Sequence, residues 1–213
     1  MTTSTLASPR ENRRASELER RRTDALNAAS AVFASKGYHD AQMTEIAAAA
    51  ELSRASLYSM FTGKEELYQE VISTAAVAVR DVVHQKVEAL DDPAHQLLCV
   101  IDSLFSCYEE NQNLLRIYAL GTHGQPFKIR DAMGDSGLEI FVAFTEWVVQ
   151  IAKRARRAGY LQGLDPEAVG LALVGTVTTT AARWLETTPD RPLSRAAPPV
   201  HAIFQQLLGA RGN

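Results

Sequence analysis

Apolar residues recur at every third or fourth position along most of the chain, which is the spacing of one helix face. Residues 18–36 form the first such segment, ended by Gly37, and a long segment spans residues 64–90. Between them lie two short segments, 43–50 and 53–60, of about two turns each. No segment alternates apolar and polar residues as a strand would. The pattern therefore predicts an all-α protein.

The remaining chain continues the same pattern, so that about nine helices are expected in all. Asp92 and Asp165 each precede a proline, a pairing typical of a helix N-cap and first turn. Thr62 and Glu65 have the T-x-x-E spacing of a capping box before residues 64–90. The further helical segments are 93–108, 113–120, 138–157, 165–186 and 196–209.

The order of these segments predicts a small helical domain followed by a larger one. Residues 1–15 are mostly polar and are expected to form a flexible basic arm; residues 16–63 form the small domain and 64–213 the larger one. From Arg10 to Arg22 the chain carries six arginines and three glutamates. The resulting net positive charge suits either a phosphate contact or a solvated tail.

Composition and charge narrow the classes of function. The 213 residues are 46% hydrophobic and 22% charged, as in an ordinary globular protein with a proper core. The net charge of -3 gives no global basic field, so a nucleic-acid partner would have to meet a local patch. The N-terminus lacks the apolar middle of a signal peptide, and we expect a cytoplasmic protein with no membrane partner.

The sequence gives little support for catalysis. Its five histidines are scattered, with no H-x-x-x-H pair, no C-x-x-C motif and no glycine-rich phosphate loop. Cys99 and Cys107 lie too far apart on one helix for a disulfide and are expected to be reduced core thiols. We therefore expect no enzyme activity, no cofactor and no metal site.

The short segment 53–60 is strongly polar on one side. Leu57 and Phe61 lie one turn apart beneath it. A second helix of a helix-turn-helix unit enters the DNA major groove with short polar donors on its outer face, while cations beside it contact phosphates. A solvated helical hairpin would look similar at any single position. The candidate DNA-contacting residues here are Ser53, Arg54, Ala55, Ser56, Tyr58, Ser59 and Lys64.

The segment from Ala25 to Leu67, "ALNAASAVFASKGYHDAQMTEIAAAAELSRASLYSMFTGKEEL", resembles the tetracycline-repressor (TetR) family of bacterial transcriptional regulators. The resemblance implies an N-terminal three-helix helix-turn-helix domain and a C-terminal helical domain for ligand binding and dimerisation. It also adds Gln42 and Thr44, at the start of the second helix, to the candidate DNA contacts. A double-stranded palindromic operator, a second copy of the chain and a small-molecule effector are the implied partners.

This chain departs from the family pattern within its helix-turn-helix domain, the part expected to read DNA and here called the reading head. Where the family usually has glycine in the turn, this chain has Glu51, which predicts a non-glycine residue in the left-handed region. Met60 stands where the family commonly has histidine, and residues 1–70 carry a net charge of only -1. An alternative hypothesis is therefore a helical ligand-binding or protein-interaction module whose DNA-reading head has degenerated.

The helix at 165–186 is apolar over most of its circumference and must be covered on both sides. By resemblance, it would form a four-helix dimer interface with the last helix; burial within its own domain is the alternative. The predicted interface residues are Val169, Leu173, Val177, Trp184, Val200, Phe204 and Leu207.

Large side chains of mixed polarity lie on the helices that enclose the family's ligand pocket, although ordinary core packing explains them as well. An effector bound there would favour a spacing of the two heads that no longer fits the operator, which would release a repressor from DNA. The effector is expected to be largely apolar. The predicted pocket residues are Leu104, Phe105, Tyr108, Tyr118, Phe127, Phe141, Phe144, Trp147 and Thr178.

Overall fold

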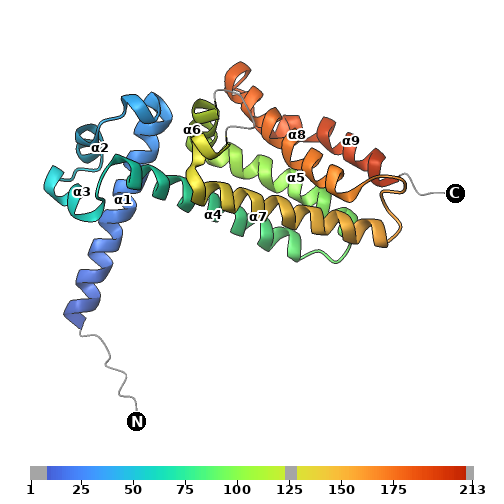
Figure 1. Ribbon diagram of the computed structural model, residues 1–213, viewed down its shortest axis with the longest axis horizontal. Helices are drawn as coiled ribbons and strands as arrows, with labels where there is room; N and C mark the ends of the chain where they lie inside the picture. Colours follow the sequence, from blue (N-terminus) through green and yellow to red (C-terminus); the bar gives the residue numbers. More distant parts are fainter. Residues whose placement is uncertain (1–8, 123–128, 210–213) are drawn as a thin grey trace, which may run out of the picture. The chain divides into compact units, whose positions relative to one another are not determined.

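The computed structural model describes residues 9–122 and 129–209, and every regular element in these ranges is a helix (Figure 1). The all-α prediction is therefore confirmed. The chain divides into two compact units, Met1–Val71 and Ile72–Asn213. This division falls eight residues after the predicted boundary at residue 63, because the fourth helix, α4 (Lys64–Glu88), begins in the first unit and continues into the second.

The first unit consists of α1 (Pro9–Asp40), α2 (Met43–Ala49), α3 (Arg54–Met60) and the first turns of α4. Helices as short as α2 and α3 are marginal in isolation, so they depend on packing against α1 and α4. The side chains that hold them are Phe33, Ile46, Leu57 and Phe61, at most 1% exposed. The apolar spacing in the sequence correctly predicts this core.

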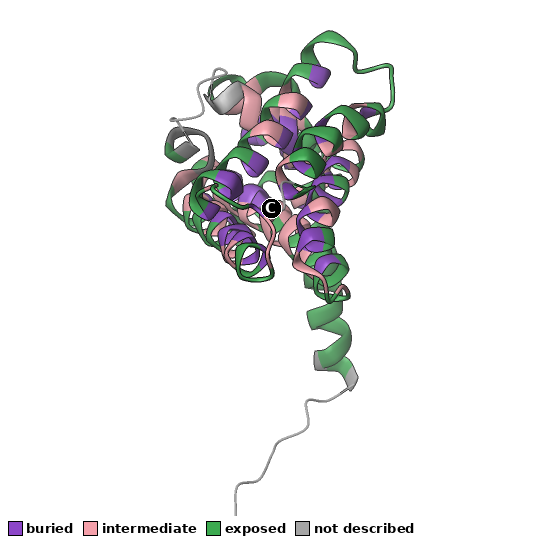
Figure 2. Cartoon of the chain, turned by 90° about the vertical axis from the view of Figure 1, so that its right-hand side faces the viewer, coloured by how far each residue is buried: buried purple, intermediate pink, exposed green. Residues whose placement is uncertain are grey.

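The first helix begins at Pro9, so residues 9–15, expected to lie in a flexible arm, are helical. Proline is well tolerated in a first helical turn. Glu17 pairs with both Arg20 and Arg21 three and four residues on, and such pairs support an exposed helix. The N-terminal half of α1 is exposed nearly throughout (Figure 2).

The turns around α3 are formed by local side-chain and backbone features. Glu51 has a φ of 56°, which confirms the predicted left-handed residue between α2 and α3. The Ser53 side chain caps α3 by accepting a hydrogen bond from the backbone N–H of Ser56 at 3.1 Å. Ahead of α4, both the N–H and the hydroxyl of Thr62 donate to Glu66, not to the expected Glu65. These bonds lower the pKa of the Glu66 carboxyl.

The second unit is a bundle in which α5 lies centrally and contacts α6, α7, α8 and α9 (Figure 1). Buried positions lie on the sides of these helices that face one another (Figure 2). Val83 and Val87 bring α4 into the same core. The elements are α5 (Pro93–Glu110), α6 (Gln112–Thr122), α7 (Ile129–Arg157), α8 (Pro166–Thr187), the short 3-10 helix η2 (Leu193–Ala196) and α9 (Ala197–Gly209).

Helix α8 packs very closely against α7. A Cβ atom added at Gly170 would lie 2.7 Å from Cγ2 of Val149 and 3.0 Å from its Cα, so glycine permits this approach. The predicted N-cap is confirmed, because the Asp165 side chain accepts a hydrogen bond from the Ala168 N–H. Within the described residues, α8 is the one helix long and apolar enough to cross a membrane, although its inner face forms part of this core.

Candidate nucleic-acid interface and ligand pocket

The outer face of α3 is exposed, while its inner face is anchored in the core. Arg54, Ala55, Tyr58 and Ser59 are exposed, with Tyr58 at 46%. Ser53 is exposed at the N-cap and Ser56 is half-buried. A seven-residue helix that buries Leu57 and presents a guanidinium and several hydroxyl groups outward has the dimensions and chemistry needed in a major groove.

Arg22 of α1 fixes the C-terminal end of α3. One nitrogen of its guanidinium donates to the Met60 carbonyl at 3.0 Å, and its carbon lies 4.5 Å from the centre of the Phe61 ring. The same guanidinium pairs with Glu70 on α4. Arg22, the last of the six arginines between Arg10 and Arg22, therefore holds α1, α3 and α4 together inside this unit.

Lys64, at the start of α4, is also committed within the unit. Its ammonium group donates to the carbonyls of His39 at 2.9 Å and Ala41 at 3.1 Å, and it lies 4.7 Å from the centre of the Tyr38 ring. Two of its three N–H donors are thus used to close the turn between α1 and α2. Lys64 was predicted as a phosphate contact, and the structure gives it this additional positioning role.

Gln42 and Thr44 lie at the exposed N-terminus of α2. Gln42 is the N-cap, and its N–H donates to the Glu45 carboxylate at 3.4 Å. Lys36 holds the same carboxylate at 2.6 Å, and this bond lowers the pKa of Glu45. Both predicted contact residues therefore project from a helix end that is fixed to α1.

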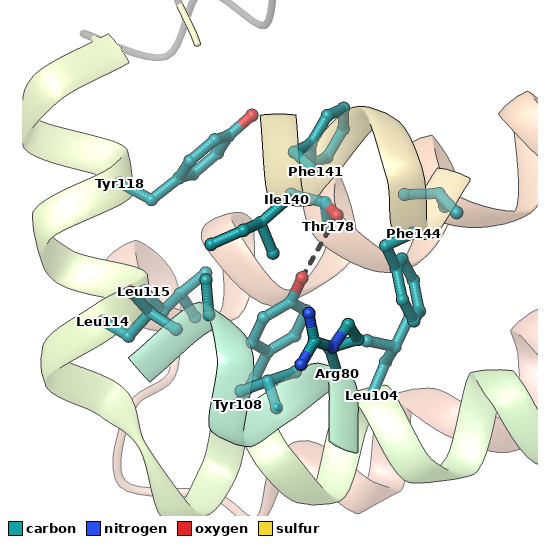
Figure 3. Close-up of a pocket in the computed structure, with 13 residues that line it drawn as sticks. Arg80, Leu104, Tyr108, Leu114, Leu115, Tyr118, Ile140, Phe141, Phe144 and Thr178 are labelled. Atoms are coloured by element: carbon teal, nitrogen blue, oxygen red, sulfur yellow. Dashed lines mark hydrogen bonds between the residues drawn. The ribbon is translucent and has the colours of Figure 1, made fainter. Parts of the chain in front are cut away.

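A cavity of about 670 Å³, its open mouth included, lies among α4, α5, α6, α7 and α8 (Figure 3). The lining is almost entirely apolar. Its residues are Ala76, Val79, Arg80, Leu104, Tyr108, Leu114, Leu115, Tyr118, Ile140, Phe141, Phe144, Val174 and Thr178.

The polar groups of this cavity come from separate helices. Arg80 on α4 is the one charged residue in the lining, and Asp81 pairs with it at 2.7 Å. Tyr108 on α5 and Thr178 on α8 face each other with their hydroxyl oxygens 3.5 Å apart (Figure 3). Burial raises the pKa of the Tyr108 hydroxyl, so it stays protonated at neutral pH.

Six of the nine predicted pocket residues line this cavity: Leu104, Tyr108, Tyr118, Phe141, Phe144 and Thr178. Phe105 lies elsewhere, in the core beside a groove between α5 and α9. Trp147 stacks on His84 with ring centres 3.9 Å apart, and Phe127 lies outside the described residues. Arg80 was not predicted to line the pocket. It is a single cation at the end of the apolar run of residues 75–79, and such an isolated charge was a usable signal.

The residues predicted for the dimer interface lie inside a single chain. Val169, Leu173, Val177, Trp184, Val200 and Phe204 are at most 6% exposed, and Leu207 is half-buried. They face inward because the larger side chains of α8 and α9 fill the core of this unit. The outward faces of the two helices carry other apolar residues, of which Leu171 and Ile203 are each 53% exposed.

Among the described residues, no three His, Cys, Asp or Glu side chains are grouped so as to hold a metal ion.

The fold and the exposed α3 place this chain in the class of helix-turn-helix proteins. Residues 25–71 match the model of the bacterial regulatory proteins of the tetR family. The helix-turn-helix segment of the chain therefore matches this family, and a relative and a solved structure of similar fold are described as transcriptional regulators.

Among its relatives is the HTH-type transcriptional activator FasR of Mycolicibacterium smegmatis, 35% identical over 108 residues. This match covers 50% of the chain and 49% of FasR, so the chain spans about half the length of that relative.

Solved structures share the fold over nearly the whole chain. The fatty acid degradation regulator FadR from Bacillus halodurans has a TM-score of 0.76 at 20% identity and covers 91% of this chain and 97% of its own. FadR from Bacillus subtilis, solved with stearoyl-CoA, has a TM-score of 0.74 at 20% identity and covers 85% and 96%.

Proposed function

We propose that this protein is a repressor that binds a palindromic operator as a homodimer and is released by a small-molecule effector. The observation that carries the proposal is the α3 surface, where Arg54 and Tyr58 are exposed on a helix anchored by Leu57. Arg54 would contact base edges, while hydroxyl groups such as that of Tyr58 would meet phosphate oxygens.

A mobility-shift assay with the DNA upstream of the protein's own gene, at two salt concentrations, tests DNA binding. We expect retardation at low salt that weakens steeply at higher salt, because phosphate contacts release counterions. Arg54→Ala should reduce the preference for this DNA over unrelated DNA. The absence of retardation at low salt would favour the alternative, a helical module with a degenerate reading head.

Homodimerisation supplies the second reading head. One α3 reads only a few base pairs, and two-fold dimers gain specificity by contacting two half-sites. The outward faces of α8 and α9 support this proposal, because Leu171 and Ile203 leave apolar surface uncovered in the single chain. A second copy packed there would cover it.

The cavity supports an apolar effector with an anionic end. Its walls are apolar, and Arg80 offers a cation for a carboxylate or phosphate. One structural neighbour is described as a fatty acid degradation regulator, and another, a transcriptional regulator, is in complex with stearoyl-CoA. We therefore place long-chain fatty acids or their thioesters first among candidate effectors.

An effector shifts a conformational equilibrium only by its different affinity for the two states. Titrating stearate and stearoyl-CoA into the DNA complex should therefore release the DNA. If a ligand binds but tightens the complex, the repressor assignment is wrong, and an activator such as FasR is the better comparison. If neither binds, this class of effector is excluded.

The relatives are transcriptional regulators, and we propose no enzymatic activity and a cytoplasmic location for this protein. Access to chromosomal DNA requires that location in a bacterium.

A further inference from the structure

The interior of the cavity contains two hydroxyl groups that are poorly matched to each other. The oxygens of Tyr108 and Thr178 lie 3.5 Å apart, whereas an O–H···O hydrogen bond is usually 2.7–2.8 Å. Each hydroxyl can donate one hydrogen bond and accept two. One long contact leaves most of this capacity unused within a lining that is apolar apart from Arg80 and Tyr118.

These two hydroxyls differ from Arg80, the cation of the cavity, both in their chemistry and in the groups that they contact. Arg80 is bound by Asp81 through two nitrogens, at 2.7 and 2.9 Å, and its side chain is 36% exposed. It is thus accessible from solvent, as a site for an anionic group would be. Tyr108 and Thr178 instead join α5 to α8 and point toward each other (Figure 3).

A plain hydrocarbon chain would be a poor occupant of this part of the cavity. It would exclude water from both hydroxyls and return no hydrogen bond, and burying an unsatisfied polar group is unfavourable. Two oxygens 3.5 Å apart can both contact a third oxygen at about 2.8 Å. A ligand oxygen bridging them would satisfy both groups.

We propose that the effector is an oxygenated long-chain acid or thioester, whose hydroxyl or oxo group is bound between Tyr108 and Thr178. This inference rests on the proposed effector site and specifies its chemistry further. The anionic end of the same molecule pairs with Arg80. The hydroxyl pair therefore selects against the unsubstituted chain of the same length.

The test is calorimetric titration of the full-length protein with octadecanoic acid and with its hydroxy and oxo derivatives, substituted at successive positions along the chain. The best derivative should bind about tenfold more tightly than the parent acid, because a neutral hydrogen bond contributes about 0.5–1.5 kcal/mol. Tyr108→Phe and Thr178→Val each remove one hydroxyl at nearly constant volume, so each should lower this ratio to about threefold, because one of the two hydrogen bonds remains.

Tyr160→Phe and Thr176→Val serve as matched controls, since neither residue lines the cavity, and both should keep the ratio. Far-UV circular dichroism checks that every variant is folded. If all derivatives bind like octadecanoic acid, or if the preference is undiminished in both cavity variants, the inference is wrong while the proposed effector class stands. If none of the acids binds, the effector class itself fails.

Discussion

Glu51 adopts a backbone conformation that costs free energy. Its φ of 56° lies in the left-handed region, which costs a non-glycine residue about 1–2 kcal/mol. We expect Glu51→Gly to raise the free energy of unfolding by about 1 kcal/mol, offset in part by the greater entropy of glycine in the unfolded chain. Thermal unfolding measures this change in stability, and Glu51→Ala is the control. Equal stabilisation by alanine would contradict a backbone cause.

His84 should make stability depend on pH. Burial lowers its pKa, partly opposed by Glu88, and its ring stacks on Trp147. As the pH falls below about 6.5, the unfolded chain takes up a proton that folded His84 resists, so the free energy of unfolding decreases. The loss is complete once the pH falls below the depressed pKa.

Urea unfolding of the wild type and of His84→Phe between pH 7.5 and 5 measures this effect. The phenylalanine variant keeps an aromatic ring against Trp147 but cannot take up a proton, so it should lose less stability on acidification. The same pH dependence in both proteins would mean that His84 does not contribute.

At the scale of elements, the close approach of α7 and α8 depends on Gly170. Alanine there is a better helix former by about 1 kcal/mol, but its Cβ would lie 2.7 Å from Val149. Overpacking costs about 1–3 kcal/mol, so we expect Gly170→Ala to destabilise the protein. Denaturant unfolding should show partial recovery in the double variant with Val149→Ala. A single variant as stable as the wild type would contradict this packing.

The sequence predicts elements better than it predicts partners. Helical spacing locates nearly every helix, and the buried residues of the first unit follow from it. The positioning roles of Arg22 and Lys64 do not, because their partners lie 38–48 and 23–25 residues away in the chain. For α8 the spacing shows apolar residues all round. This spacing alone does not determine which face of α8 turns inward, because that depends on how the side chains fit against α5 and α7.

At the scale of the whole molecule, the central expectation is a dimer formed through α8 and α9. Leu171→Arg and Ile203→Arg each place a charge on the proposed interface and should give monomers with weakened operator binding. Val142→Arg is the matched control, because Val142 on α7 is 55% exposed but lies outside these helices. Sedimentation velocity distinguishes the states. A wild-type monomer at micromolar concentration, or dimers in all variants, would contradict this interface.

The most direct test of the account is hydroxyl-radical footprinting of the protein on the DNA upstream of its own gene. Two reading heads related by two-fold symmetry should protect two windows, about 10 base pairs or a multiple of that apart from centre to centre. Arg54→Ala should weaken both windows together. A single window, or no protection at low salt, would contradict a dimeric DNA-binding regulator.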